Sequence, residues 1–320
     1  MSLVRIIPRL DIKGPNVVKG LCFDGYRVLG HPETFAQTYY RAGADELFFQ
    51  DTVASLYKRN NLLEIIRRTA EKVMLPITVC GGIRTLDDIK VVLRSGGDKV
   101  AINTAAIADP TLIEDAAKMF GSQCIVASIE AKKRDYDFNQ RYKNYVGYQD
   151  SAFINPKYGK YEAWVDYGRQ PTGIDVFEWA KKVVDLGAGE IYLSSVDKDG
   201  TGEGFDLEFV NKVASISTVP VIVCSGAGKI GHFKEAIDSG ADAVSAASIF
   251  HYYYAEAVET EFMSYTEREL RKGKQIDSGN VEFLNFGYGG FEEIQVVPCS
   301  INTVKNYLRE NGIGVREDNK

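Results

Sequence analysis

The sequence predicts a (β/α)8 TIM barrel, an α/β fold, built as a two-fold half-barrel repeat with two insertions. Three observations carry this prediction: eight short apolar runs, amphipathic segments between them, and an internal repeat. Strands that are apolar along their whole length are typical of a parallel sheet covered on both faces. Eight such strands alternating with helices fit a closed barrel, and a doubly wound open sheet is the alternative.

The strand candidates follow one another at residues 4–12, 46–52, 76–82, 98–104, 123–131, 190–197, 220–226 and 242–250. Between them, apolar residues recur at the spacing of an amphipathic helix, as in NLLEIIRRTAEKV, TLDDIKVVLRSG, TLIEDAAKMFG and DVFEWAKKVVDLG. A last helix, INTVKNYLRENG, closes the chain. The alternation of strands and helices is therefore that of a barrel.

An internal repeat favours the barrel over the open sheet. Residues 79–107 align with residues 223–250, and every matched position is offset by 144. This offset matches Cys80 with Cys224, Gly82 with Gly226, Asp98 with Asp242, and Thr104 with Ser248. It also carries the run AGADE onto LGAGE. Two internally similar halves are the expected signature of two four-stranded half-barrels.

Two segments lie outside the repeat. Residues 133–170, rich in tyrosine and charge, are expected to form a long loop after the fifth strand, and residues 251–298 intervene after the eighth. Loops of this length inside a compact domain are usually functional or disordered. Neither segment is predicted to be an independent domain, so residues 1–320 are interpreted as one barrel domain.

Composition narrows the classes of function. The 320 residues hold 38 Lys and Arg against 44 Asp and Glu, a net charge of −6, which argues against a nucleic-acid binder. With no run of eighteen apolar residues and no signal-peptide pattern, we expect a cytoplasmic protein without a membrane segment. Five scattered cysteines and three separated histidines predict reduced thiols, no metal centre and no cofactor. Acid–base chemistry would then depend on carboxylates.

Two Gly-rich turns, CGGIRT and CSGAGK, each end a strand and open a helix. Glycine lets the backbone approach an anion, and a helix N-terminus supplies amide donors. The segments INTAA (102–106) and AASIF (246–250) each follow one of these units. The pattern predicts two symmetric anion sites for a substrate with a phosphate at each end; tight βα turns without a ligand are the alternative.

Two carboxylates end strands at the same predicted face. Asp11 follows the first strand and Glu130 the fifth, so the repeat places them opposite one another. Such a pair divides acid and base roles when the two environments separate their pKa values, and structural carboxylates that cap loops are the alternative. Lys19, on the first long loop, is a candidate substrate clamp, and Asp199 follows the sixth strand.

Four charges of alternating sign lie near the N-terminal ends of strands: Arg5, Glu46, Lys99 and Glu190. Period-two alternation gives Arg5 the same inward face as Arg9 and Asp11. The residues alone favour a ring of salt bridges that plugs the base of the barrel.

The chain resembles the cyclase subunit of imidazole glycerol phosphate synthase, HisF. The motifs that carry the resemblance are IIPRLDIKGPNVVKG, GADELFFQD, TVCGGIRT, DKVAINTAA, FGSQCIVASIEAK, PTGIDVFEWA, GAGEIYLSSVDKDGTGEGFD, VIVCSGAGK and AASIFH, over about residues 3–134 and 162–251 with the last helix. The resemblance implies a lyase in a glutamine amidotransferase complex. It would take ammonia from a bound glutaminase, HisH, and use it on a bis-phosphorylated ribulosyl substrate to yield imidazole glycerol phosphate and an aminoimidazole carboxamide ribotide.

Site residues carry over by position. Asp11 matches the family's first catalytic aspartate, Glu130 stands at the second, and Lys19 matches the loop lysine. One implied phosphate site is Gly82, Asn103 and Thr104, and the other is Asp199, Gly200, Gly226, Ala247 and Ser248. The resemblance turns the charged ring into an ammonia gate and implies that Asp98 lies at the glutaminase interface.

The chain departs from the family pattern inside the barrel. Glu130 keeps a carboxylate but moves it by one methylene, and Arg9 replaces a small residue. Strand parity also points Gln50, Ser128, Tyr192 and Ser245 inward. A buried guanidinium must be paired or hydrogen-bonded, and these side chains together with Asp11 are the candidate partners. We expect Arg9 and Gln50 to tune the interior, with an Arg9–Asp11 contact that keeps Asp11 ionised.

Three hypotheses of function remain. The first is the histidine-pathway reaction, which the phosphate sites favour. The second is a HisF-like paralogue, similar to those encoded with bacterial surface-polysaccharide (lipopolysaccharide) genes, that supplies ammonia for amidination of a sugar; Arg9, Glu130 and the insertions favour it. The third is an inactive activator of the glutaminase, against which the retained Asp11 and the phosphate sites count.

Overall fold

The computed structural model describes residues 3–54, 62–134, 160–262 and 296–317. Eight parallel strands form a closed ring in the order β1-β4-β5-β6-β7-β10-β11-β12, because β12 pairs with β1 and β10 pairs with both β7 and β11. The predicted (β/α)8 barrel is confirmed, and the open-sheet alternative is wrong. The barrel strands are β1 (Arg5–Lys13), β4 (Leu47–Asp51), β5 (Ile77–Cys80), β6 (Lys99–Ile102), β7 (Ile125–Lys133), β10 (Glu190–Ser195), β11 (Val221–Cys224) and β12 (Ala243–Ala246).

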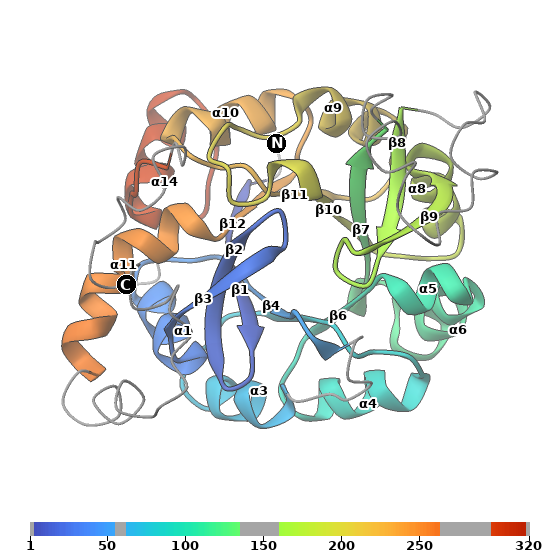
Figure 1. Cartoon of the computed structure of the whole chain (residues 1–320), viewed down its shortest axis with the longest axis horizontal. Helices are drawn as coiled ribbons and strands as arrows, with labels where there is room; N and C mark the ends of the chain where they lie inside the picture. Colours follow the sequence, from blue (N-terminus) through green and yellow to red (C-terminus); the bar gives the residue numbers. More distant parts are fainter. Residues whose placement is uncertain (1–2, 55–61, 135–159, 263–295, 318–320) are drawn as a thin grey trace.

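Helices surround the ring of strands (Figure 1). They are α1 (Pro32–Arg41), α3 (Leu63–Ala70), α4 (Leu86–Arg94), α5 (Thr104–Ala108), α6 (Thr111–Phe120), α8 (Val176–Asp185), α9 (Leu207–Ile216), α10 (Ile230–Asp238), α11 (Ser248–Phe262) and α14 (Ile301–Glu310), with short 3-10 turns η1 (Ser122–Cys124) and η2 (Val196–Lys198). Side-chain caps start several of them; the Asp175 carboxylate, for example, accepts from the backbone N–H of Phe177 at 2.8 Å.

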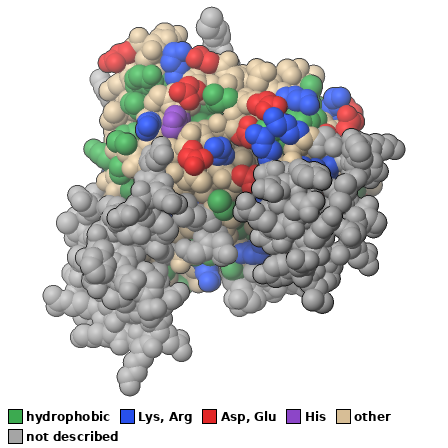
Figure 2. All heavy atoms as spheres, turned by 45° about the horizontal axis from the view of Figure 1, so that its top comes forward, with side chains coloured by type: hydrophobic (Ala, Val, Ile, Leu, Met, Phe, Trp, Pro, Cys, Tyr) green, Lys and Arg blue, Asp and Glu red, His purple; other side chains and the backbone are tan. Residues whose placement is uncertain are grey.

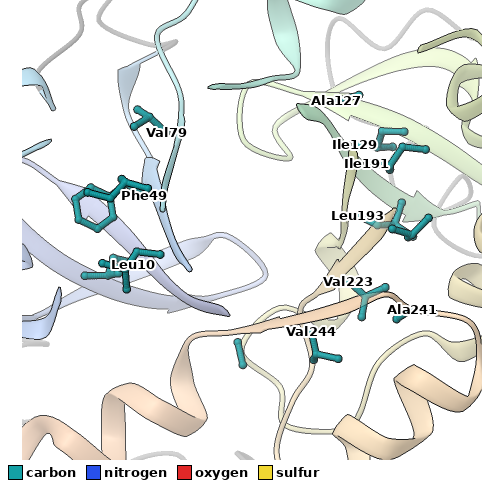
Figure 3. Close-up of a cluster of buried hydrophobic side chains, with 14 of the residues drawn as sticks. Leu10, Phe49, Val79, Ala127, Ile129, Ile191, Leu193, Val223, Ala241 and Val244 are labelled. Carbon is teal, nitrogen blue, oxygen red and sulfur yellow. The ribbon is translucent and has the colours of Figure 1, made fainter. Parts of the chain in front are cut away.

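The main core lies between the strands and the helices. Figure 3 shows strand side chains of this cluster, among them Leu10, Phe49, Val79 and Ile191, which are fully buried. The alternate residues of the same strands point into the barrel and form a second, smaller cluster around Phe48 and Tyr192. Each barrel strand is therefore buried on both faces: apolar side chains point toward the helices, and the barrel interior holds both apolar and polar side chains, such as Phe48 and Arg9.

The two halves of the barrel repeat their bonding. The Asp98 carboxylate accepts from the backbone N–H of Ile77 at 2.8 Å, and the Asp242 carboxylate accepts from that of Val221 at 2.9 Å. Both members of each pair are offset by 144. The same offset relates the caps of α4 and α10: Asp88 accepts from the N–H groups of residues 84 and 85, and His232 Nδ1 from those of residues 228 and 229.

Several expectations about single segments were wrong in part. The strand expected at 242–250 ends at Ala246, because residues 248–250 already belong to α11. The first long loop is a hairpin of β2 (Asn16–Leu21) and β3 (Asp24–Gly30), which crosses the middle of the view in Figure 1, so Lys19 lies on a strand.

The first insertion is also more ordered than a loop. Strand β7 runs on to Lys133, and β8 (Tyr161–Val165) pairs antiparallel with it, followed by β9 (Gln170–Asp175). In the second insertion, residues 251–262 continue α11. The predicted loop portions at 135–159 and 263–295 lie outside the described residues.

Acidic and basic side chains are interspersed on the described part of the face shown in Figure 2, where hydrophobic side chains are scattered. Within the described ranges, no helix combines the length and the apolar composition needed to cross a membrane.

Candidate functional site

Asp11 lies at the C-terminal end of β1 and is completely buried. Its Oδ1 accepts hydrogen bonds from Arg9 Nε at 2.7 Å and from the Tyr167 hydroxyl at 2.9 Å, and Lys19 Nζ lies 3.3 Å from Oδ2. Burial alone would raise the pKa of Asp11, but the charges of Arg9 and Lys19 and the Tyr167 hydrogen bond outweigh it and lower the pKa to about 2. Asp11 is therefore ionised.

Arg9 is buried in the barrel interior, and each of its three guanidinium nitrogens has a hydrogen-bond partner. It donates to Asp11 and to the Tyr167 hydroxyl at 2.9 Å, with longer contacts to Ser194 Oγ at 3.5 Å and Cys224 Sγ at 3.6 Å. The guanidinium carbon also lies 5.1 Å from the centroid of the Phe23 ring.

The expected Arg9–Asp11 contact is present, but the other expected partners of Arg9 are not bonded to it. Gln50 donates to the Asp51 carbonyl oxygen instead, and the Tyr192 hydroxyl lies 2.8 Å from Ser245 Oγ. All four polar residues chosen by parity are buried, Ser128 included. The Arg9 side chain extends toward the C-terminal end of the barrel strands, called the mouth from here on. Its partners therefore come from the mouth and from β10 and β11.

Glu130 ends the buried part of β7 at the same mouth. Its Oε2 accepts from the backbone N–H of Gly168 at 2.8 Å. Burial raises the pKa of Glu130 to about 7, against the lowering effects of that bond and of the Arg9 charge. Two carboxylates of one face thus differ strongly: Asp11 is held as an anion, and Glu130 changes its protonation near neutral pH.

Two turns meet above Asp11. Phe23, in the β2–β3 turn, stacks on Tyr167, in the β8–β9 turn, with ring centroids 4.2 Å apart. Both residues are buried, and both have positive φ, 65° and 59°. A non-glycine residue there costs about 1–3 kcal/mol, and such strain is concentrated at functional sites.

Sequence reasoning missed Tyr167, Gly168 and Phe23. The signal that could have found the hairpin is the β-rich run YEAWV followed by the turn DYG. This run lies inside residues 133–170, where the richness in tyrosine and charge predicts a loop.

The first predicted anion site forms part of one cavity of about 460 Å³. Gly82, Asn103 and Thr104 all line it, together with Glu130 and Tyr167. The β8–β9 hairpin already bonds two of the residues predicted to bind the anion, Asn103 and Thr104.

Asn103 Nδ2 donates to the Trp164 carbonyl oxygen at 3.1 Å, and Thr104 Oγ1 accepts from the Asp166 N–H at 3.0 Å. The Asp166 residue also lines the cavity. This half of the mouth is therefore less free for a phosphate than the sequence suggested.

The second predicted anion site is also brought together, in a smaller cavity. Its lining includes Lys19 and all the residues implied by the resemblance: Asp199, Gly200, Gly226, Ala247 and Ser248. Ser248 Oγ, at the start of α11, is buried and has no hydrogen-bond partner among the described residues. A buried hydroxyl at a helix N-terminus is suited to a ligand oxygen. Lys19 Nζ bonds Asp199 Oδ1 at 2.5 Å.

A glycine is required at position 226 by the backbone packing itself, independently of any ligand. Its φ is +105°, and a Cβ atom there would lie 2.1 Å from the carbonyl oxygen of Gly204. The N–H of Gly204 donates to the Gly226 carbonyl oxygen at 2.7 Å. The glycine is thus needed for two backbone segments to approach, whether or not an anion binds.

The four charges at the base form a closed ring. Arg5 contacts Glu46 at 2.9 Å and Glu190 at 2.7 Å, and Lys99 contacts Glu46 at 3.0 Å and Glu190 at 2.8 Å. The Thr78 hydroxyl donates to Glu46 as well. Asp98 is exposed beside this end of the barrel.

The described part of the chain contains no cluster of three or more His, Cys, Asp or Glu residues suited to a metal ion. The cysteines are all unpaired thiols.

Comparisons with known proteins agree with this architecture. The family model for histidine biosynthesis proteins matches residues 5–256. The chain is 52% identical to imidazole glycerol phosphate synthase subunit HisF of Legionella pneumophila, over 73% of this chain and 100% of that protein. It is 44% identical to the HisF subunit of Methanocaldococcus jannaschii, over 85% and 96% of the two chains, and 46% identical to that of Streptomyces avermitilis, over 78% and 90%.

Proposed function

The chain belongs to the HisF family of imidazole glycerol phosphate synthase cyclase subunits, and from this premise we propose that it uses ammonia from a HisH-like glutaminase on a bis-phosphorylated ribulosyl substrate. The products would be imidazole glycerol phosphate and an aminoimidazole carboxamide ribotide. The observation that carries the proposal is the pair of carboxylates with separated pKa values, Asp11 at about 2 and Glu130 at about 7, between two cavities lined by the predicted anion ligands.

In the proposed reaction the two carboxylates have different tasks. Asp11, held as an anion by Arg9 and Lys19, stabilises positive charge in the substrate, and it becomes an effective proton acceptor once these contacts are released. Glu130 exchanges its proton near neutral pH, where general acid–base groups work best. Asp11 is fully buried and its Oδ1 is bonded by the Tyr167 hydroxyl, so Tyr167 has to move before the carboxylate can contact a substrate.

The substrate's two phosphates would bind at opposite sides of the mouth. The second cavity offers Ser248, the α11 N-terminus and the Lys19 ammonium. The first offers Gly82 and the N–H groups around Thr104, once the contacts of the hairpin with Asn103 and Thr104 are released.

A second candidate is supply of ammonia for amidination of a sugar. The observation that favours it is the occupied first cavity, where the hairpin bonds Asn103 and Thr104 and adds the Asp166 carboxylate beside the predicted phosphate position. A ligand with one phosphate and a neutral polyhydroxyl group would leave the hairpin contacts in place, and its phosphate would need the second cavity, about 10 Å³, to widen. An inactive activator of the glutaminase is the third candidate.

Ammonium salts discriminate between these candidates, because the cyclase step needs only ammonia. Purified chain, the ribulosyl substrate and saturating ammonium chloride should give imidazole glycerol phosphate without any glutaminase. No product from the active-site-intact protein would contradict the proposed reaction. Amidination of a nucleotide-activated sugar in the presence of its sugar-modifying enzyme would then support the second candidate, and stimulation of the glutaminase alone would support the third.

A further inference from the structure

Two aromatic rings meet on the axis of the barrel. Phe48 lies on β4 and Tyr192 on β10, and three strands separate β4 from β10 in either direction around the ring. The two rings stack with centroids 3.7 Å apart and an angle of 13° between their planes. Atoms in van der Waals contact lie about 3.5–4.0 Å apart, so no molecule passes between the rings.

The stack is fixed from the side. The Tyr192 hydroxyl and Ser245 Oγ lie 2.8 Å apart, which ties the ring to β12. Small apolar side chains of the same buried cluster fill the space around the two rings: Ile7, Ala101, Val126, Ile222 and Ala243. Protein interiors packed in this way contain few voids larger than a water molecule, and ammonia is about the size of water.

Further groups close the axis above and below the stack. Toward the mouth, the Arg9 guanidinium lies inside the barrel and bonds Asp11, Ser194 and Cys224. Toward the base, the ring of Arg5, Glu46, Lys99 and Glu190 is closed by four ion pairs. A molecule moving along the axis would have to break contacts at three successive levels.

We infer that the barrel axis is closed at Phe48 and Tyr192, and that the ammonia used at the mouth arrives from the surrounding solvent and not along the axis. The inference rests on the proposed function, in which ammonia is a reactant at the mouth, and on the glutaminase interface that the family resemblance implies near Asp98, at the opposite end of the barrel. It makes the charged ring a structural closure of the base, which is the interpretation that the residues alone favour.

Isotope dilution tests the route. The complex with the cognate glutaminase is given glutamine labelled with nitrogen-15 in the amide, together with increasing amounts of unlabelled ammonium chloride, and the label in the product is measured by mass spectrometry. If ammonia arrives from solvent, the labelled fraction follows the bulk ammonia pool, and each doubling of that pool halves it. A product that stays fully labelled in excess ammonium would overturn the inference.

The matched control is Tyr192→Phe, which removes the bond to Ser245 and keeps the stacked ring. Its product should be diluted as in the unmodified chain. Retained label in this variant alone would show that the hydroxyl, rather than the stack, closes the axis, which also contradicts the inference as stated.

Crystals under krypton pressure test the closure without any turnover. The unmodified chain should bind no krypton on the axis between the charged ring and Arg9, whereas Phe48→Ala should bind krypton in the volume that the ring vacates. Krypton on the axis of the unmodified chain, or separated rings, would overturn the inference. Absence of product from ammonium salts would contradict the proposed function instead, so the two failures are distinguishable.

Discussion

The Tyr167 hydroxyl donates a hydrogen bond to Asp11 Oδ1 at 2.9 Å and at the same time accepts one from Arg9. Tyr167 comes from the β8–β9 hairpin and Asp11 from the first strand, so the bond joins an insertion to the centre of the family site. If Asp11 contacts the substrate as proposed, Tyr167 competes with the substrate for this carboxylate.

Tyr167→Phe should therefore lower KM. The variant keeps the ring that stacks on Phe23 but loses the bond that substrate binding must break, and we expect KM for the ribulosyl substrate to fall by up to about tenfold, which corresponds to about 1.4 kcal/mol. Stability should fall by about 1.5–3 kcal/mol, the range for hydrogen bonds to charged groups. Steady-state kinetics and urea unfolding measure the two effects. Tyr253→Phe, on an exposed helix position, is the control, and an unchanged KM in Tyr167→Phe would contradict the competition.

Asp11→Asn should reduce ammonium-dependent kcat by about 10²–10⁴-fold, because an amide carries no charge and accepts no proton from a reacting group. The glutaminase should still bind and be stimulated, since Asp11 lies at the mouth. Asp115→Asn on the exposed side of α6 controls for a general effect of losing a carboxylate. A loss below about tenfold would remove Asp11 from the catalytic role.

The pH profile of kcat should fall on its alkaline side (the basic limb) because of Glu130. Its pKa of about 7 means that the protonated acid is lost as the pH rises through neutrality, so turnover should fall there if Glu130 donates a proton. Glu130→Asp should keep measurable turnover, whereas Glu130→Gln should lose most turnover and the limb with it. A limb that persists in Glu130→Gln belongs to another group.

Glu130 also links stability to pH. Its pKa is raised in the folded state, so its contribution is fully present below the unfolded value near 4.5 and is lost as the pH rises through about 7. Glu130→Gln should therefore become more stable than the unmodified chain above neutral pH, by up to about 3 kcal/mol at about 1.4 kcal/mol per pKa unit. Urea unfolding at pH 5 and at an alkaline pH measures the difference, and an equal effect at both would contradict the raised pKa.

Asp98→Ala should weaken the complex with the glutaminase and its stimulation of glutamine hydrolysis. The variant also removes the bond to the Ile77 N–H, and Asp242→Ala is a matched control because it removes the equivalent bond to Val221 in the other half. Gel filtration and glutamine hydrolysis measure the two variants. Equal losses in both would assign the effect to stability and would place the partner elsewhere.

The barrel was predictable because its signals are local. A strand buried on both faces shows itself in four to nine consecutive residues, and a helix in its own spacing, so each element could be identified without its neighbours. The residues around the mouth were found through the repeat and the family motifs, which fix their places at strand ends.

The contacts over the site were not predictable in this way. The Asp11–Tyr167 bond spans 156 residues, and no periodicity connects its two ends. The stack of Phe48 on Tyr192 likewise follows from closure of the ring: parity points Tyr192 inward, but only the opposite placement of β4 and β10 brings the rings together.

The caps of α4 and α10 show what a duplicated unit keeps and what it is free to change. The backbone donors at residues 84 and 85 recur at 228 and 229, yet a carboxylate accepts in one copy and an imidazole in the other. Burial lowers the pKa of His232 below its usual value, so the neutral imidazole is the form that accepts these bonds, and acid strong enough to protonate it would remove the acceptor in this copy. Two copies of one ancestral half have thereby become chemically unequal, and the molecule has an acid-sensitive half that its symmetry conceals.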